Sequence, residues 1–273
     1  PPVPWGHAFI ACLTHDVDFG GIRLHKLDRT AGGFVYRALL GSLIELARGR
    51  RSLSGLIKNW IAVFSLPLVH LGVARDFWND FDEYAEIEKG LASTYFLIPF
   101  KNRAGAKIKD GRAAWRAARY DIGDMKKQVR ALIRRGFEIG LHGIDAWHDP
   151  QKGKQEIRRI VEVTGREGIG VRVHWLCFDR GSFQAMEQAG FDYDSTVGYN
   201  DAVGYKAGTT QAFRPPGLAR LMELPLHIQD TALFSPKRLA LTPEEAWNAC
   251  GAVLEAAGRF AGVVTVSWHQ RSL

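Results

Sequence analysis

Cysteine, methionine and long apolar runs are scarce in this chain of 273 residues. Its three cysteines, Cys12, Cys177 and Cys250, are far apart, which excludes a disulfide framework or a Cys-x-x-Cys site and favours a reducing compartment. The longest apolar stretch, Trp60 to Gly72, is interrupted by a proline and a histidine. It is shorter than the roughly 20 residues of a transmembrane helix. No secretion signal or internal repeat is recognisable, so we expect a globular protein that is cytoplasmic or peripheral to a membrane.

The composition is that of an ordinary globular protein, with 46% hydrophobic and 24% charged residues. The length suits one α/β barrel domain of about 250 residues. The net charge is +7, and part of it lies in one cluster, Arg48, Arg50, Arg51 and Lys58. This cluster is either a solvated helix face or a site that attracts an acidic glycan, a phosphate-linked lipid or an anionic membrane. No nucleic-acid-binding motif accompanies the charge, so we expect no nucleic-acid partner.

Two aspartates stand where the first predicted strand ends. The apolar run from His7 to Leu13 predicts a buried strand, and Asp16 and Asp18 follow it two residues apart. Residues i and i+2 of a strand point the same way, so both carboxylates can face one site. Two close carboxylates repel each other unless a cation lies between them. The segment therefore predicts either a divalent-metal site, with one aspartate as ligand and the other as base, or a turn with two solvated aspartates.

A second polar cluster follows the strand predicted over 137–142. His142 ends that strand, and Asp145, His148 and Asp149 come after it. Imidazole is a common metal ligand, and an aspartate with two histidines is a common open zinc site. Together with the two aspartates above, this cluster favours a metal site over a loop with one hydrogen-bonding histidine.

Two further predicted strands also end on polar side chains. Arg172 and His174 share one face of a strand over 171–177, and His269 follows a β-branched run. Functional residues at the C-terminal ends of several strands are typical of α/β barrels. Strand and helix patterns alternate, so we predict a distorted (β/α) barrel of about seven parallel strands. The predicted strands are 8–15, 92–99, 137–142, 171–177, 192–197, 222–228 and 262–268, and the predicted helices are 76–90, 121–135, 151–164, 182–188 and 243–259.

Residues 19–75 interrupt this alternation. We predict a helical insertion here, after the first strand of what is otherwise a single domain over 1–273. Helices that pack in the core are the first interpretation of its apolar stretch. The alternative is a lid or a membrane-apposed element, with peripheral membrane contact through 48–72, which the preceding basic cluster supports.

The order of these motifs resembles the polysaccharide deacetylase family, also called NodB-homology proteins or carbohydrate esterases. The resemblance covers most of the chain outside 19–75. It implies a distorted (β/α) barrel, a divalent metal, most often Zn²⁺, and hydrolysis of an N-acetyl or O-acetyl group on a sugar. The segments that carry it are Thr14-His15-Asp16-Val17-Asp18, His142 with His148, Arg172-Val173-His174-Trp175, Gly190 to Thr196, and Trp268-His269.

The resemblance also implies a role for each matching residue. Asp16 is the expected general base, and Arg172 is expected to pair with it and hold it ionised. His269 is the expected general acid that protonates the leaving amine, and an acidic residue is expected beside it. The expected metal ligands are Asp18, His142 and His148.

The spacing of the two ligand histidines is wider than the family pattern. His142 and His148 are six residues apart, so His174 and Asp145 are alternative ligands or substrate contacts. Side chains suited to bind the sugar are Trp147, Trp175, Tyr199, Arg214 and Trp268.

The sequence therefore predicts a metal-dependent deacetylase of an acetylated sugar, polysaccharide or lipid-linked glycan, with an N-acetyl group preferred, that acts in polysaccharide or glycolipid biosynthesis. One alternative is a metal-dependent hydrolase of a non-sugar amide on the same fold, because a fold does not decide its substrate. Another is a catalytically inactive carbohydrate-binding or assembly protein. The sequence does not predict an oligomeric state.

Overall fold

The computed structural model describes residues 6–106 and 117–269, which form two compact units. Unit 1 contains the chain up to Asp18 and again from Phe81 onward, and unit 2 is Phe19–Asp80. Unit 2 therefore interrupts unit 1 in sequence directly after its first strand.

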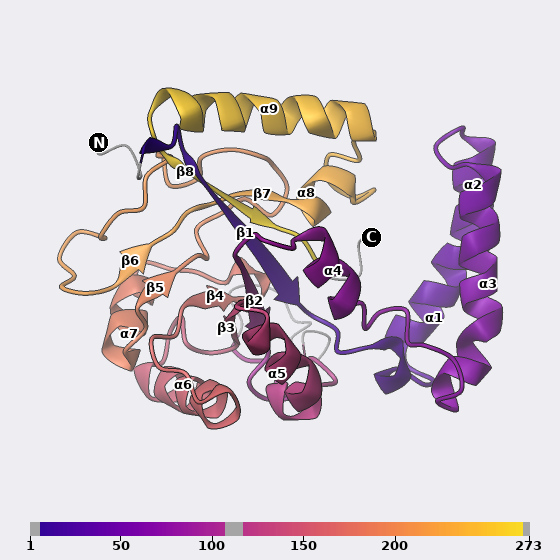
Figure 1. The fold of residues 1–273 in the computed structure, drawn as a ribbon, viewed down its shortest axis with the longest axis horizontal. Helices are drawn as coiled ribbons and strands as arrows, with labels where there is room; N and C mark the ends of the chain where they lie inside the picture. Colours follow the sequence, from indigo (N-terminus) through magenta and orange to yellow (C-terminus); the bar gives the residue numbers. More distant parts are fainter. Residues whose placement is uncertain (1–5, 107–116, 270–273) are drawn as a thin grey trace. The chain divides into compact units, whose positions relative to one another are not determined.

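The described part of unit 1 contains a curled sheet of eight parallel strands in the order β6-β5-β4-β3-β2-β1-β8-β7 (Figure 1). The two edge strands, β6 and β7, are separated in sequence only by Leu224 and Pro225, so the two edges must lie close together. This confirms the predicted distorted (β/α) barrel. The strands are β1 (Ile10–Val17), β2 (Ser93–Leu97), β3 (Glu138–Gly143), β4 (Val171–Val173), β5 (Tyr193–Asp194), β6 (Met222–Glu223), β7 (Leu226–Gln229) and β8 (Val263–Ser267).

The strand predicted over 222–228 is divided into β6 and β7, which gives eight strands instead of about seven. Pro225 has no N–H group to donate within a sheet, so a strand is interrupted at this position. The amides of the residues on either side of Pro225 are still hydrogen-bonded. Leu224 N–H donates to the Asp194 carbonyl at 2.8 Å, and Leu226 N–H donates to the Val197 carbonyl at 3.1 Å. The chain thus passes from one edge of the sheet to the other within two residues.

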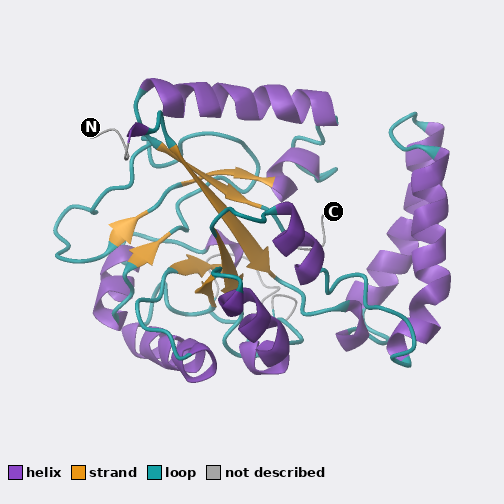
Figure 2. Cartoon of the chain, viewed as in Figure 1, coloured by secondary structure: helices purple, strands orange, loops and turns teal. Residues whose placement is uncertain are grey.

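The helices of unit 1 surround the strands (Figure 2). Their starts follow local capping chemistry: Asp149 accepts the first amides of α6, and Thr242 and Glu245 form a capping box at α9. These helices are α4 (Phe81–Ile87), η5 (Ile122–Met125), α5 (Lys126–Arg134), α6 (Pro150–Thr164), η6 (His174–Leu176), α7 (Ser182–Ala189), α8 (Asp230–Phe234) and α9 (Pro243–Arg259).

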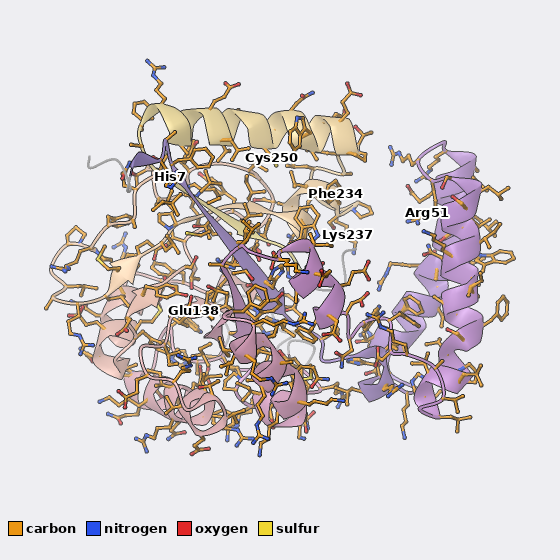
Figure 3. The ribbon with its side chains drawn as sticks, viewed as in Figure 1. His7, Arg51, Glu138, Phe234, Lys237 and Cys250 are labelled. Carbon is orange, nitrogen blue, oxygen red and sulfur yellow. The ribbon has the colours of Figure 1, made fainter. Side chains whose placement is uncertain are left out.

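Unit 2 is a small group of helices whose longest member has most of its surface exposed. In α3 (Leu53–His70), only Leu56 and Val69 are buried, and its side chains project outward along its length (Figure 3). Within the apolar stretch that begins at Trp60, Val69 and Leu66 pack into the small apolar cluster of unit 2. Its other large side chains, Trp60, Ile61, Phe64, Leu68 and Leu71, stay exposed. The other helices are η2 (Ile22–Leu24), α1 (Arg29–Tyr36), the π-helix η3 (Arg37–Gly41) and α2 (Ser42–Ala47).

Helix α3 begins seven residues before that apolar stretch and contains 18 residues. By length and composition alone, it is the one helix in the described residues that could cross a membrane. The sequence prediction that this region is too short to cross a membrane considered only Trp60 to Gly72. The observed helix α3 is longer than that stretch, and most of its apolar side chains are exposed.

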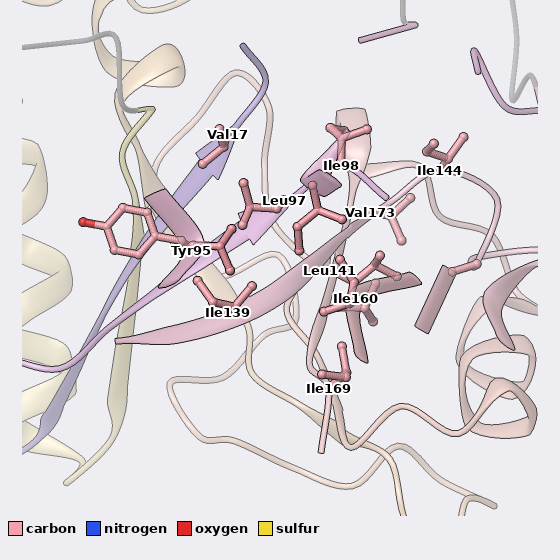
Figure 4. Packing of buried hydrophobic residues seen from close by; sticks show 14 of the residues in the cluster. Val17, Tyr95, Leu97, Ile98, Ile139, Leu141, Ile144, Ile160, Ile169 and Val173 are labelled. Carbon is pink, nitrogen blue, oxygen red and sulfur yellow. The ribbon is translucent and has the colours of Figure 1, made fainter. Parts of the chain in front are cut away.

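Alternation along β1–β4 separates an apolar outer layer from a polar interior. Residues that are paired in register in a parallel sheet point to the same side, and Asp16 pairs with Phe96, which pairs with Gly140. Two residues further along β3, His142 pairs with Arg172. Side chains of the opposite parity form the main buried apolar cluster with the surrounding helices (Figure 4), including Val17, Tyr95, Leu97, Ile139, Leu141, Val171 and Val173.

Candidate functional site

The C-terminal ends of four strands bring one aspartate and three histidines together in unit 1. Asp18 Oδ1 lies 3.2 Å from His142 Nε2 and 3.4 Å from His174 Nε2, and Asp18 Oδ2 lies 3.5 Å from His269 Nε2. Asp18 directly follows β1, His142 lies in β3, His174 directly follows β4, and His269 follows β8. Asp18, His142 and His174 offer ligand atoms within 4.8 Å of one another, so this group is suited to hold a metal ion.

The hydrogen bonds of His142 determine which of its nitrogens faces Asp18. Its Nδ1 lies 2.9 Å from the carbonyl oxygen of Arg172, and since a carbonyl only accepts, Nδ1 carries the proton. In the neutral ring, Nε2 then has a lone pair and no hydrogen. That lone pair faces a carboxylate oxygen, and two such acceptors repel each other unless a proton or a cation lies between them. This tautomer is also the one in which imidazole binds a metal through Nε2.

Asp16 lies beside this group and is paired with a fully buried arginine. Arg172 Nη1 donates to Asp16 Oδ1 at 2.9 Å and to Thr14 Oγ1 at 2.6 Å. Burial by itself would raise the pKa of Asp16, but the positive charge of Arg172, helped by that of His269, outweighs it and lowers that pKa below its usual value. Asp16 is therefore an ionised carboxylate within the barrel.

Arg172 is held in place by side chains of β1 and by Ser195, which directly follows β5. Its Nε donates to the Ser195 carbonyl at 2.9 Å and its Nη2 donates to Ser195 Oγ at 2.7 Å. The hydroxyl of Thr14, which accepts from Arg172, donates in turn to the Val266 carbonyl at 2.7 Å. Because its side chain is fully buried and packs 4.6 Å from the ring of Phe96, the guanidinium has a fixed orientation toward Asp16.

His269 lies between two carboxylates. Its Nδ1 lies 2.6 Å from Asp230 Oδ1, and its backbone N–H donates to Asp230 Oδ2 at 3.1 Å. Burial opposes protonation of this ring, but the hydrogen bond and negative charge of Asp230, followed by Asp18 and Asp16, raise the pKa of His269 to about 9. His269 is therefore protonated near neutral pH and can donate a proton. Asp230 is the acidic residue that was expected beside His269 but could not be named from the sequence.

Asp18 is the carboxylate at which these histidines converge. Burial alone would raise its pKa, but the histidines around it, including His269 with its positive charge, outweigh burial and lower the pKa of Asp18 well below its usual value. A carboxylate oxygen and two imidazole nitrogens form the donor set of an open zinc site. The residues present therefore fit the divalent metal that the sequence predicted.

His148, the third ligand in the sequence prediction, lies outside this group. Its Nε2 is 2.9 Å from Asp145 Oδ1, and Asp145 also accepts from Ala106 N–H at 2.7 Å and from Lys152 Nζ at 3.2 Å. His148 and Asp145 thus connect the loop after β3 to the segment near Ala106. His174, the alternative ligand, occupies the position beside Asp18.

A buried glutamate holds the backbone of the loop after β3. Glu156 of α6 accepts from Ile144 N–H at 3.0 Å and from Asp145 N–H at 2.8 Å. Burial, as the largest cause, raises the pKa of Glu156 to about 7. This contact holds the backbone that follows His142, including Asp145, to which His148 is hydrogen-bonded.

The sugar-binding candidates differ in exposure. Trp147 is only 5% exposed and belongs to the main apolar cluster, so it has little surface to offer a sugar. Trp268 is partly buried and packs against the same cluster, and Arg214 is exposed in a loop. Trp175 and Tyr199 are 57% and 39% exposed, which leaves them as the aromatic candidates with accessible rings.

Trp175 is presented beside the site by an unusual backbone. Both Trp175 and Leu176 have positive φ angles, 65° and 51°, in the left-handed region that residues with a Cβ rarely adopt. This turn, η6, ends β4 directly after Val173 and places His174 toward Asp18 with Trp175 at the surface. Such strain costs about 1–3 kcal/mol per residue and is concentrated at functional sites.

No family profile matches the sequence. A structure from Mycobacterium smegmatis, provisionally described as a polysaccharide deacetylase, superposes with a TM-score of 0.53 at 19% identity, over 99% of this chain and 80% of that one. The chain has the polysaccharide deacetylase fold. The resemblance seen in the motifs is thus confirmed at the level of the fold.

One curated relative also matches in sequence. It is a peptidoglycan deacetylase-like protein from Gibberella zeae, 24% identical over 144 residues. The match covers 50% of this chain and 42% of the relative, so the chain spans less than half the length of the curated protein it matches. On this polysaccharide deacetylase fold, Asp16, Asp18, Arg172 and His269 lie together in one site.

Proposed function

We propose that this chain is a metal-dependent hydrolase that removes an acetyl group from an acetylated sugar, with an N-acetyl group preferred. The observation that supports the proposal most directly is that a histidine nitrogen with a lone pair faces the Asp18 carboxylate. His142 Nε2 presents a lone pair to the carboxylate at 3.2 Å because its other nitrogen donates to a backbone carbonyl. A cation between these atoms removes their repulsion, which supports a metal site made by Asp18, His142 and His174.

A divalent cation bound there would supply Lewis-acid chemistry, polarising a carbonyl group and acidifying a water molecule. Zn²⁺ suits this set of one oxygen and two nitrogen donors best. The proposed ligand set uses His174 in place of His148, since His148 is hydrogen-bonded to Asp145. Every other step is assigned to side chains of the chain itself.

Asp16 is proposed as the general base that accepts the proton of the attacking water. A base must be ionised to act, and the paired guanidinium of Arg172 keeps the pKa of Asp16 low despite burial. Arg172 cannot itself accept a proton, so it orients Asp16 without competing for the same role. A positioned base of this kind contributes about 10²–10⁴-fold in rate.

His269 is proposed as the general acid that donates a proton to the leaving nitrogen. Asp16 must be deprotonated before the reaction, whereas His269 must be protonated. Asp230 binds its Nδ1 at 2.6 Å and raises the pKa of His269 to about 9, which leaves Nε2 as the donor that faces the site. An N-acetyl substrate has a more basic leaving atom than an O-acetyl one and depends more strongly on this proton.

The substrate is proposed to be a saccharide that stacks on Trp175, with Tyr199 as a further contact. Both rings are exposed, and Trp175 directly follows the ligand candidate His174. Aromatic rings bind sugars through their apolar faces and provide large contact area. The provisional description of the Mycobacterium smegmatis structure as a polysaccharide deacetylase supports the same substrate class. A role in polysaccharide or glycolipid biosynthesis belongs to this proposal.

The metal assignment is tested by elemental analysis of the full chain and of two matched single variants. We expect about one metal ion per wild-type chain, its loss in His174→Ala and its retention in His148→Ala. The two variants remove the same ring from neighbouring loops, so a general effect of losing a histidine would appear in both. Loss in His148→Ala with retention in His174→Ala would assign the third ligand to His148. No metal in the wild type after Zn²⁺ is supplied would refute the metal site.

The reaction is tested by acetate release from N-acetylated and O-acetylated oligosaccharides. Asp16→Asn should abolish release while metal content is kept, which separates the base from the ligands. His269→Gln should reduce release from N-acetylated substrates more than from O-acetylated ones. If the chain hydrolyses simple non-sugar acetamides but no acetylated sugar, its substrate is a non-sugar amide. If it binds glycans tightly but hydrolyses none of these substrates, it is a catalytically inactive binding protein.

A further inference from the structure

The exposed surface of unit 2 contains a continuous apolar stripe along α3. Its members follow helical spacing at i, i+4, i+7, i+11 and i+14, which places them on one side of a helix. Their exposed fractions are all one half or more: Ile57 50%, Ile61 62%, Phe64 70%, Leu68 50% and Leu71 77%. Large contiguous apolar surfaces of this kind mark contacts with a protein or a membrane.

The opposite side of α3 is attached to the rest of unit 2. Asn59 Nδ2 donates to Ser42 Oγ at 2.7 Å, and Arg23 Nε donates to the Val69 carbonyl at 2.7 Å. Leu56 and Val69 are the buried apolar residues on that side. The stripe is therefore a face that unit 2 does not use for its own packing.

The charge around the stripe is of one sign. Arg48, Arg50 and Arg51 directly precede α3 and Lys58 lies within it, whereas Glu45 is the single acidic residue between Arg29 and Arg75. Arg51 lies at the end of unit 2 where α3 begins (Figure 3). A basic cluster beside an apolar helix face is complementary to an anionic lipid surface, which attracts cations at its headgroups and apolar groups below them.

Other occupants fit these residues less well. A partner helix in a coiled coil is usually selected by charged residues of both signs beside the apolar seam, but the exposed positions beside this stripe include Trp60 and Pro67. A second copy of the chain would bring two basic clusters of like charge to one interface. Tryptophan and lysine next to an apolar face are instead typical of helices at the boundary between water and lipid.

We propose that unit 2 binds an anionic lipid bilayer, with α3 lying in the plane of the interface and its stripe inserted among the acyl chains. A helix of 18 residues is about 27 Å long, and α3 is attached along its other side to α2 and to Arg23. This attachment and the charge of Lys58 favour a helix that lies on the membrane over one that spans it. The proposal is independent of the reaction assigned to unit 1.

The proposal is tested by flotation of the full chain with vesicles of phosphatidylcholine alone or with one quarter phosphatidylglycerol. We expect binding to the anionic vesicles, weaker binding to the neutral ones and a decrease at high salt. The double variant Ile61→Ser/Phe64→Ser should bind at least about tenfold more weakly, since each side chain loses its transfer into the apolar layer. The matched control, Trp247→Ser/Phe260→Ser, removes two exposed apolar side chains of unit 1 and should bind as the wild type does.

A second pair of variants tests the charge. Each basic residue near an anionic surface contributes about fivefold in binding, so Arg50→Glu/Arg51→Glu should weaken binding by about 25-fold or more. The control Arg158→Glu/Arg166→Glu changes the net charge equally on exposed residues of unit 1 and should have little effect. Circular dichroism should show equal helix content in all four variants.

Three outcomes would overturn the proposal. The first is no binding of the wild type to anionic vesicles, and the second is binding by Ile61→Ser/Phe64→Ser that equals the wild type. The third is a wild-type dimer in sedimentation velocity without lipid that becomes a monomer in the same variant, which would show that a second copy covers the stripe.

Discussion

Replacement of Arg172 by methionine removes the buried charge that keeps Asp16 ionised and leaves most of the side-chain volume in place. Arg172 donates to Asp16 Oδ1, to Thr14 Oγ1, and to both the carbonyl and the hydroxyl of Ser195. The two hydroxyls keep other partners, because Ser195 Oγ donates to the Leu224 carbonyl and Thr14 Oγ1 to the Val266 carbonyl. The loss therefore falls on the Asp16 carboxylate and the Ser195 carbonyl.

The expected cost is large for one substitution. Breaking a buried ion pair by removing one partner costs about 3–5 kcal/mol, within the usual total stability of about 5–15 kcal/mol for a protein. We expect Arg172→Met to fold with a much lower urea midpoint. The urea titration is done with a chelator present, so that no bound cation contributes.

The pH dependence identifies the cause. In the wild type, the pKa of Asp16 is below its usual value, so this group stabilises the fold above about pH 4, and the contribution is lost as pH falls. Without Arg172, burial dominates and the pKa rises above that of the unfolded chain, so stability falls as pH rises. The destabilisation by Arg172→Met should thus be greater at pH 8 than at pH 5, by about 1 kcal/mol or more.

The double variant Asp16→Asn/Arg172→Met is the control, because it removes both charges. It should be more stable than Arg172→Met at pH 8 and should lose the difference between the two pH values. A destabilisation by Arg172→Met below about 1 kcal/mol, or one equal at both pH values, would show that the pair does not hold Asp16 ionised.

Three further substitutions test other parts of unit 1. Asp230→Asn should lower the pKa of His269 from its value of about 9 by one unit or more; an unchanged imidazole titration by NMR would contradict this role. Glu156 has a pKa raised to about 7, so its ionisation destabilises the wild type as pH rises from about 4.5 to 7. The free energy of unfolding of Glu156→Gln should therefore increase by about 2–3 kcal/mol relative to that of the wild type between pH 5 and pH 8. Equal pH dependence of the two proteins in urea unfolding would exclude this. Leu141→Ala, at a fully buried core position, should cost about 2–5 kcal/mol in thermal or urea unfolding, whereas the exposed Leu239→Ala should cost little.

The alternation of strands and helices was predictable because it depends on local patterns. Apolar runs of strand length, C-terminal glycines and the cap at Thr242 are properties of short segments, and the structure contains strands or helices at each of these places. The division of the strand at Pro225 was also predictable from the sequence, but 222–228 was predicted as one strand. Its reason is equally local, since proline cannot donate within a sheet.

The partners of the site residues depended on contacts between distant segments. Asp230 and His269 are 39 residues apart, and Arg172 and Asp16 are 156 apart. The order of motifs indicated the second pair through a family resemblance. Nothing near Asp230 in sequence distinguishes it from an ordinary helix-start aspartate, so only the pairing of β7 with β8 brings it to His269.

By itself, the sequence determined the fold class and the chemistry of the available groups, because periodicity and residue type are local. Carboxylates and imidazoles at strand ends already indicated a metal and proton transfer. Only the tertiary structure decided which histidine faces Asp18, because that depends on the register of β3 with β4 and on the contact of Glu156 with the loop before His148. It also decided that the apolar side of α3 stays exposed, since burial is a property of what surrounds a helix and not of the helix alone.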